Sequence, residues 1–316
     1  MTERQGEEIT QSPNPPVSVS PGHLVSVSSK HKTLPYLALL VGVTAMGMSA
    51  IFVKWANAPG AVTGFYRMLI AIAVFALPVG LRAKREGPLS LRHVWFAMLG
   101  GIFFALDLSI WNTSVTMTSA ANSTLFGNTS VIWVAIGALV VFKEKLRPIF
   151  WVGLIIALIG MLIVLGQDFI THPTLGMGDI LATVAGLWYG LFFLAAERSR
   201  DKLSSFTAWW VSSATSTVAL WVICLVFGMP LFGYSPETYW NFFAIAIVVQ
   251  VVSLLCVNYA LGHLPASIVS PTLLGQPVTT AIFAIPLLGQ WLSVAQIIGG
   301  LLVMVGILIV HWSKTR

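Results

Sequence analysis

The chain has 316 residues, of which 57% are hydrophobic and only 9% are charged. Soluble proteins carry about 25% charged residues, so this composition excludes a soluble protein and indicates a polytopic membrane protein. The net charge of +6 would suit a nucleic-acid partner, but the basic residues lie where they mark membrane topology instead. The two cysteines, Cys224 and Cys256, lie in apolar runs and predict neither a disulfide nor a metal site.

The N-terminal residues 1–33 are polar and show neither apolar periodicity nor a signal-peptide pattern, so we expect a disordered tail. From Leu34 onward the chain contains ten apolar segments of about 20 residues, the length with which a helix crosses about 30 Å of hydrocarbon. The sequence therefore predicts an all-α membrane protein with ten transmembrane helices at 34–56, 61–81, 92–112, 118–142, 148–166, 177–197, 206–228, 238–260, 265–288 and 291–312.

The connections between these segments distribute Lys and Arg unequally. Of the 17 basic residues, Lys54 and Arg67 lie inside predicted helices, and all the others fall on the side that holds the N-terminus. Cytoplasmic loops carry the excess of basic residues, so we expect the N-terminal tail and residues 313–316 in the cytoplasm. The opposite side includes an expected linker over 167–176 and carries only the acidic residues Asp168, Asp179 and Glu237.

The chain also contains an internal repeat. Residues 112–164 align without a gap with residues 258–310 at a shift of 146 positions, and the matches include Gly153 with Gly299 and Gly160 with Gly306. The repeats are predicted to be 34–166 and 177–312. Each has five helices, and this odd number makes the second copy enter the membrane in the opposite sense. Inverted repeats of this kind are typical of secondary transporters whose substrate site lies near the membrane midplane.

Three stretches resemble the EamA family of the drug/metabolite transporter superfamily: the Phe65-Tyr66-Arg67 start of the second segment, LFGNTSVIWVAIGALVVFKEKL at 125–146, and GDILATVAGLWYGLFF at 178–193. The resemblance covers 34–312. It implies a carrier or exporter of small organic metabolites, such as amino acids, in the bacterial inner membrane, with alternating access and a central cavity between the repeats. One residue departs from the family pattern, because the acidic position after the fourth helix is Glu144 in the first copy but Gln290 in the second.

The fourth and ninth segments are the expected walls of that cavity. Polar side chains occupy two faces of the segment 118–142, and such a helix belongs in the protein interior because unpaired polar groups are costly in lipid. These side chains would alternatively serve only to hold helices together. The candidate cavity residues, which include an aromatic pair beside glycines of the sixth segment, are Asn122, Phe126, Asn128, Trp133, Trp188, Tyr189, Thr272 and Gln276.

With Asp179 assigned to the outer side, the charged residues that we place within the membrane are Lys54, Arg67 and Asp107. Burying a charge in a membrane is costly unless the charge is paired or hydrated, so we expect an Arg67–Asp107 or a Lys54–Asp107 ion pair. Such a pair would either stabilise the first repeat or take part in substrate recognition or proton exchange. Lys54 alternatively extends its ammonium group to the membrane surface.

These features favour a secondary transporter whose partners are a small-molecule substrate and the lipid bilayer. We expect no cofactor, no bound metal and no nucleic-acid partner, and the sequence leaves the oligomeric state open. A membrane-embedded enzyme acting on lipid or isoprenoid is an alternative, although such chemistry needs an acid–base pair, a metal cluster or an activated nucleophile. A receptor or scaffold without flux is a third possibility.

Overall fold

The computed structural model describes residues 33–86, 90–130, 132–134, 136–137, 147–171, 173–199, 202–261, 263–264, 269, 272–273 and 275–314. Within these ranges the regular structure is helical and contains no strand. The predicted tail lies outside the described residues apart from Thr33. The basic turn that ends the fourth predicted helix is described only from Arg147, so its Glu144 also lies outside them.

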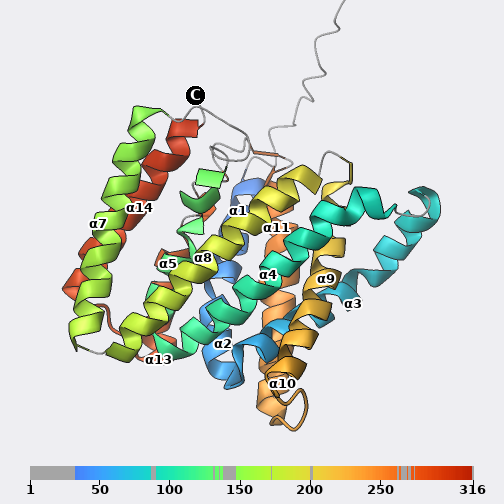
Figure 1. Cartoon of the computed structure of the whole chain (residues 1–316), viewed down its shortest axis with the longest axis horizontal. Helices are drawn as coiled ribbons and strands as arrows, with labels where there is room; N and C mark the ends of the chain where they lie inside the picture. The colour runs from blue at the N-terminus through green and yellow to red at the C-terminus, as the bar shows by residue number, and fades with distance from the viewer. Residues whose placement is uncertain are drawn as a thin grey trace, which may run out of the picture. The chain divides into compact units, whose positions relative to one another are not determined.

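Figure 1 shows the described helices in chain order. They are α1 (Leu34–Gly47), α2 (Ser49–Ala56), α3 (Gly60–Glu86), α4 (Leu91–Met117), α5 (Ala120–Gly127), α7 (Pro148–Thr171), α8 (Pro173–Ser199), α9 (Ser205–Val226), α10 (Pro236–Ala244), the π-helix η2 (Ile245–Val252), α11 (Ser253–Leu261), α13 (Gln276–Leu288) and α14 (Val294–Lys314).

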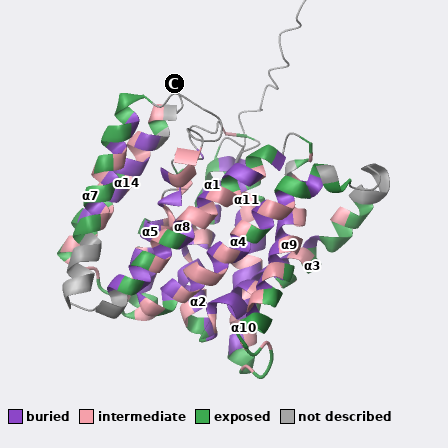
Figure 2. Ribbon diagram, viewed as in Figure 1, coloured by how far each residue is buried: buried purple, intermediate pink, exposed green. Residues whose placement is uncertain are grey.

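Six helical stretches in the described part are long and apolar enough to cross a membrane. They are Leu34–Ala56, Gly60–Leu81, His93–Met117, Gly176–Ser199, Phe206–Val226 and Pro236–Ala260. Three shorter apolar helices, Pro148–Ile163, Gln276–Leu288 and Val294–Val310, accompany them. Apolar side chains such as Leu162 (67% exposed) and Leu301 (59% exposed) remain uncovered along α7 and α14 (Figure 2). A multi-pass membrane protein explains this exposure, because lipid covers such faces.

Helix α4 packs against α8 on one side and α9 on the other. The contact with α9 is close because α4 has glycine at position 101, where an added Cβ would lie 2.4 Å from the Ser212 carbonyl oxygen. Two serine hydroxyls of α9 donate hydrogen bonds to α4 carbonyls, Ser212 to Ala97 and Ser216 to Gly101, both at 2.7 Å. Small residues and hydroxyl groups are the usual means by which membrane helices approach each other closely.

Helices α7 and α14 form a second pair, side by side in Figure 1. A Cβ added at Gly153 would lie 2.8 Å from the Gly306 carbonyl oxygen, and one at Gly160 would lie 2.5 Å from that of Gly299. These contacts make the helices antiparallel. In the 146-residue register Gly153 corresponds to Gly299 and Gly160 corresponds to Gly306. Gly153 therefore contacts the counterpart of Gly160, and Gly160 contacts the counterpart of Gly153.

Candidate functional site

Arg67 is a buried cation in the first third of α3, with 8% of its surface exposed. Its Nε donates a hydrogen bond to Gln250 Oε1 at 2.9 Å, and its Nη1 donates to Ser49 Oγ at 3.2 Å. Three elements, α2, α3 and η2, therefore meet at one guanidinium group. A guanidinium has five N–H donors, so these two bonds leave further donors for another acceptor.

The π-helix η2 explains the position of Gln250, which sequence reasoning missed. Its sequence, IAIVVQVV, contains Gln250 as its one polar side chain, and 8% of this residue is exposed. A π-helix contains more residues per turn than an α-helix and is common at functional sites, because the wider turn redirects a side chain. The sequence does contain a signal for Gln250, because a lone amide within an apolar run needs a hydrogen-bond partner when it is buried.

Asp107 on α4 is an acidic residue that interacts electrostatically with Arg67. It is 7% exposed and interacts electrostatically with both Arg67 and Tyr189. Its carboxylate makes no hydrogen bond with the described residues. Neither expected ion pair, Arg67–Asp107 or Lys54–Asp107, forms within 4.0 Å. Neutral partners on α2 and η2 hold Arg67 instead, and Asp107 interacts with it without direct contact.

Lys54, near the end of α2, belongs to a different group of side chains. Its Nζ donates a hydrogen bond to the Thr118 carbonyl oxygen at 2.8 Å, in the turn between α4 and α5. The Thr118 hydroxyl donates to Asp179 Oδ1 at 2.6 Å, and Asn122 Nδ2 donates to Asp179 Oδ2 at 3.2 Å. Helices α2, α4, α5 and α8 are thereby connected around the α4–α5 turn.

The position of Asp179 corrects the sequence interpretation, which counted this residue with the loops. The structure places Asp179 inside α8 and leaves none of its surface exposed. Gly178 allows this, because a Cβ there would lie 2.9 Å from the Thr118 backbone nitrogen. Because α8 lies close to the α4–α5 turn, the Asp179 carboxylate comes within hydrogen-bonding distance of the Thr118 hydroxyl. Among the described residues, no three His, Cys, Asp or Glu side chains gather as a metal site would require.

Asp179→Ala is expected to lower the free energy of unfolding by about 2 kcal/mol or more, because two buried donors, on Thr118 and Asn122, lose this acceptor. Asp179→Asn keeps one oxygen acceptor in the same shape and should cost less. Thermal unfolding of the purified variants in detergent measures both changes. Equal stability of Asp179→Ala and the unchanged protein would show that the carboxylate contributes nothing to this connection.

The fourth predicted segment is not one continuous helix. Helix α5 ends at Gly127, a turn follows at Asn128 and Thr129, and helical structure resumes at Ser130. In the second repeat, α13 begins at Gln276 after a turn at Gly275, whose backbone angles (φ −70°, ψ −8°) nearly equal those of Asn128 (φ −69°, ψ −8°). Gly275 corresponds to Thr129 in the repeat register, so the two breaks fall at matching positions.

The two breaks also lie against each other. Asn128 Nδ2 donates hydrogen bonds to the Thr124 carbonyl oxygen at 2.8 Å and to Gln276 Oε1 at 3.5 Å. Pro277 occupies the first turn of α13, where its missing N–H removes no helical hydrogen bond. Two of the predicted cavity residues, Asn128 and Gln276, thus meet at the junction of two broken helices, the arrangement that carriers use for midplane sites.

Gln290, the residue that departs from the family pattern, has a structural role. It lies between α13 and α14, and its Oε1 accepts a hydrogen bond from the Ala120 backbone N–H at 3.0 Å. Ala120 begins α5, where the first N–H groups of a helix lack partners within the helix. A side chain of the second repeat therefore caps a helix of the first repeat.

Gln290→Ala should lower the free energy of unfolding by about 1 kcal/mol, the usual effect of losing a helix cap. Gln290→Glu keeps an acceptor and adds a negative charge at the N-terminus of α5, where the helix dipole favours it, so its stability should be retained. Thermal unfolding in detergent compares the two variants. Losses of the same size in both would contradict the capping role.

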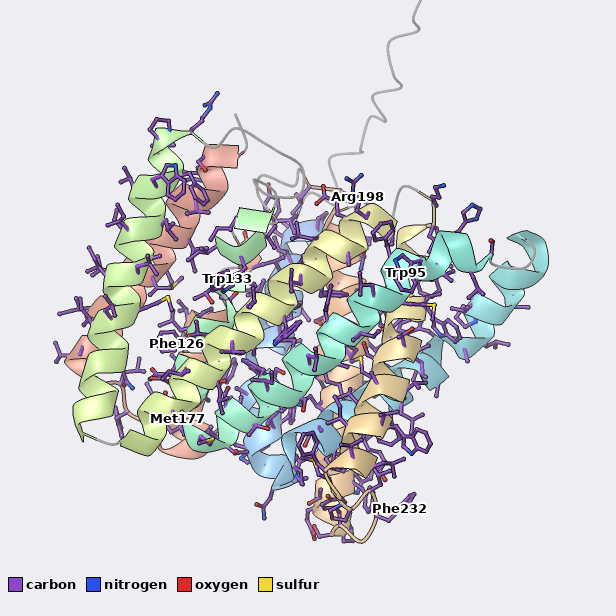
Figure 3. All side chains as sticks on the ribbon, viewed as in Figure 1. Trp95, Phe126, Trp133, Met177, Arg198 and Phe232 are labelled. Atoms are coloured by element: carbon purple, nitrogen blue, oxygen red, sulfur yellow. The ribbon has the colours of Figure 1, made fainter. Side chains whose placement is uncertain are left out.

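The remaining predicted cavity residues lie in different surroundings. Phe126 is fully buried in an apolar cluster with Leu125, Ala182, Val303 and Ile307, so it packs in the core (Figure 3). Trp133 lies against Gly190 of α8, and its buried indole N–H has no hydrogen-bond partner among the described residues. Trp188 contacts the ring of Phe103 at a centroid distance of 5.8 Å, and Tyr189 stacks with Phe104 and Phe192. Thr272 is exposed.

The structure thus separates the predicted residues into distinct groups. Arg67, Asp107 and Tyr189 form one group, and Asn128 with Gln276 forms another. Asn122 belongs with Asp179 at the α4–α5 turn. Of the residues that sequence reasoning missed, Ser49 and Gln250 complete the first group, whereas Asp179 and Gln290 stabilise the turn.

Comparison with known proteins agrees with this architecture. The sequence profile of the EamA-like transporter family matches residues 33–166 and 176–312. Two relatives, each described as an uncharacterized transporter, come from Clostridium kluyveri (22% identity over 89% of this chain and 94% of that one) and Archaeoglobus fulgidus (23% over 77% and 84%). A crystal structure with 16% identity shares the fold, with a TM-score of 0.59 over 89% of this chain and 99% of that chain. The chain therefore belongs to the EamA-like transporter family of the drug/metabolite transporter superfamily.

Proposed function

We propose that the protein is a secondary transporter that exports small organic metabolites by alternating access. The observation that carries this proposal is the buried Arg67 beside Asp107 within membrane-spanning helices. A charge is costly at that depth, and such residues generally serve transport or a closely fitted structural pair. The missing direct contact between the two side chains favours transport, because both groups keep capacity for a ligand.

The chemistry of this site suits a solute that carries both charges, as an amino acid does. The unused N–H donors of Arg67 match a carboxylate, for which the planar guanidinium is well shaped. The Asp107 carboxylate, which makes no hydrogen bond with the described residues, would accept an ammonium group. Tyr189 borders the same position and is stacked on Phe192, so its ring is held in place for a solute side chain.

The crosswise glycine contacts between α7 and α14 support two inverted repeats of five helices each. Matching positions that contact each other across an antiparallel pair are what a two-fold axis in the membrane plane produces. The two separate matches of the family profile, at 33–166 and 176–312, support the same division. We place the protein in the bacterial inner membrane with both termini in the cytoplasm, on the basis of the basic loops.

Flux in proteoliposomes tests the proposal. Purified protein is reconstituted in vesicles loaded with an unlabelled amino acid mixture, and entry of labelled amino acids by counterflow is measured, with empty vesicles as the control. We expect accumulation of at least one labelled solute that is recovered chemically unchanged. Recovery of a modified product would favour the membrane-embedded enzyme, and saturable binding without accumulation would favour a receptor.

A further inference from the structure

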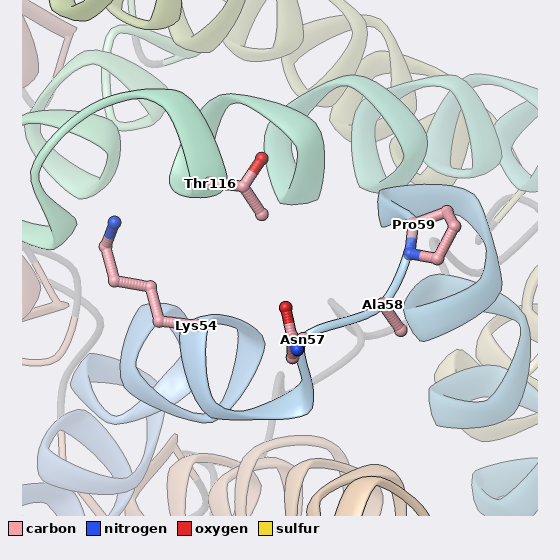
Figure 4. A pocket seen from close by; sticks show the side chains of 5 residues that line it. All are labelled: Lys54, Asn57, Ala58, Pro59 and Thr116. Carbon is pink, nitrogen blue, oxygen red and sulfur yellow. The ribbon is translucent and has the colours of Figure 1, made fainter. Parts of the chain in front are cut away.

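A pocket with a volume of about 490 Å³ lies between the end of α2 and the last turn of α4. It is lined by Lys54, Asn57, Ala58, Pro59 and Thr116 (Figure 4). Sites for small molecules have volumes of about 300–1,000 Å³, so this pocket is large enough for a metabolite of a few carbon atoms. It is distinct from the Arg67 site, because Arg67 and its hydrogen-bond partners Ser49 and Gln250 are not among the residues that line it.

The ammonium group of Lys54 is the charge of this pocket. Its one hydrogen bond goes to a neutral acceptor, the Thr118 carbonyl oxygen, and no carboxylate of the described chain lies within 4.0 Å of it. Asp179 is bonded to the neighbouring side chains of Thr118 and Asn122 instead. A partly buried cation without an anion is costly, and an ammonium group has three donors, so capacity remains for an anionic ligand.

Asn57, an exposed residue, contributes a second polar group to the pocket. Its backbone is left-handed (φ 46°, ψ 48°), the one such non-glycine residue among those described. Asparagine tolerates this conformation better than most residues. The conformation ends α2 and directs the amide toward the same hollow as Lys54 (Figure 4). The amide makes no hydrogen bond with the described residues. The Thr116 hydroxyl, in contrast, already donates to the Thr113 carbonyl oxygen at 2.7 Å.

We propose that this pocket binds the anionic oxygen group of a small solute, such as a carboxylate or phosphate, through the Lys54 ammonium and the Asn57 amide. Ala58 and Pro59 offer apolar contact to the carbon part of the same solute. This inference goes beyond the proposed function, because it concerns an equilibrium binding site that is independent of flux. Phosphate oxygens of membrane lipids have the same chemistry, so a lipid headgroup is the alternative source of the anion.

The test is direct binding by the purified full chain, without any transport assay. Saturation-transfer NMR and thermal shift are measured with succinate and with inorganic phosphate in neutral detergent at constant ionic strength. A second arm compares nanodiscs of neutral lipid with nanodiscs that contain anionic lipid. A ligand that binds the folded state raises the unfolding temperature, so both readouts report binding.

Lys54→Met keeps the length of the side chain but removes the charge, and it should weaken binding by at least about tenfold. Lys54→Arg should retain binding. Asn57→Gly keeps the left-handed backbone and removes only the amide, so it should weaken binding less while the protein stays folded. Lys202→Met, at an exposed lysine outside the pocket, is the matched control and should have no effect.

The outcomes separate the possible sources of the anion. Binding of succinate or phosphate that depends on Lys54 supports a solute site. Stabilisation by anionic lipid alone, also dependent on Lys54, supports the anion site with a headgroup as its occupant. Unchanged affinity in both Lys54→Met and Asn57→Gly, or no binding in either arm, would overturn the proposal even if the protein transports amino acids.

Discussion

Arg67→Ala is expected to reduce flux per folded molecule by at least about tenfold. A hydrogen bond to a charged group contributes about 1.5–3 kcal/mol, and each 1.4 kcal/mol corresponds to a factor of ten. The substitution removes the donors proposed to bind the substrate carboxylate. It also leaves Asp107 without its neighbouring cation and leaves Gln250 and Ser49 without a partner. The measurement is counterflow in proteoliposomes, normalised to monodisperse protein recovered after reconstitution.

Two companion variants separate recognition from stability. The double substitution Arg67→Ala with Asp107→Asn removes the uncompensated buried charge, so it should recover stability relative to Arg67→Ala. Its flux should remain low, because the carboxylate of the substrate still lacks its partner. Arg67→Lys keeps the charge but loses the forked geometry, and it should retain only part of the flux. Full flux in the double variant would show that Arg67 serves the fold alone.

Gly160→Leu is expected to have the largest effect on stability. A Cβ at this position would lie 2.5 Å from the Gly299 carbonyl oxygen and 2.7 Å from the Val303 backbone nitrogen, so the backbones of α7 and α14 would have to separate. Overpacking of this kind costs about 1–3 kcal/mol or more. The helices would also lose the close contact that their glycines provide. We expect a lower unfolding temperature in detergent and reduced recovery of monodisperse protein.

The chain supplies a matched control for this substitution. Gly80 lies in α3 with no atom within 4 Å of an added Cβ. Gly80→Ala should therefore not lower the unfolding temperature, and it should raise it slightly because alanine has a better helix propensity than glycine. Gly306→Ala, which places a Cβ 2.5 Å from the Ala157 backbone nitrogen, should destabilise the same helix pair from the other side. Stability of Gly160→Leu equal to that of Gly80→Ala would contradict the close packing of α7 on α14.

The sequence predicted several of the helical segments and the burial of Arg67 and Asp107, although these two side chains do not form the expected ion pair. Predicted spans such as 61–81 and 206–228 correspond to α3 and α9. A run of about twenty apolar residues in a membrane forms a helix, because the helix satisfies every backbone polar group within the segment. Arg67 and Asp107 were identified because a charge within an apolar run is rare. The count of ten spans stays a prediction, since six described helices reach membrane-spanning length.

The partners of these residues could not be predicted from the helical pattern. Gln250 reaches Arg67 from a π-helix, and Asn128 reaches Gln276 from the end of a broken helix. A helical wheel with a constant 100° per residue fails at both places, because each changes the phase of the helix. The burial of Asp179 was missed for a different reason. Asp179 lies near the start of an apolar run, and its burial depends on the contact with Thr118, which the sequence pattern does not show.

Accessibility of the junction between the two broken helices tests the central claim most directly. Gln276→Cys is introduced into a protein in which Cys224 and Cys256 are replaced by alanine, and a membrane-impermeant maleimide is applied to either face of oriented proteoliposomes. Alternating access predicts labelling of the cysteine at position 276 from both faces, with a transported amino acid lowering both rates. Labelling from one face only, whatever solute is present, would contradict a site that opens to each side in turn.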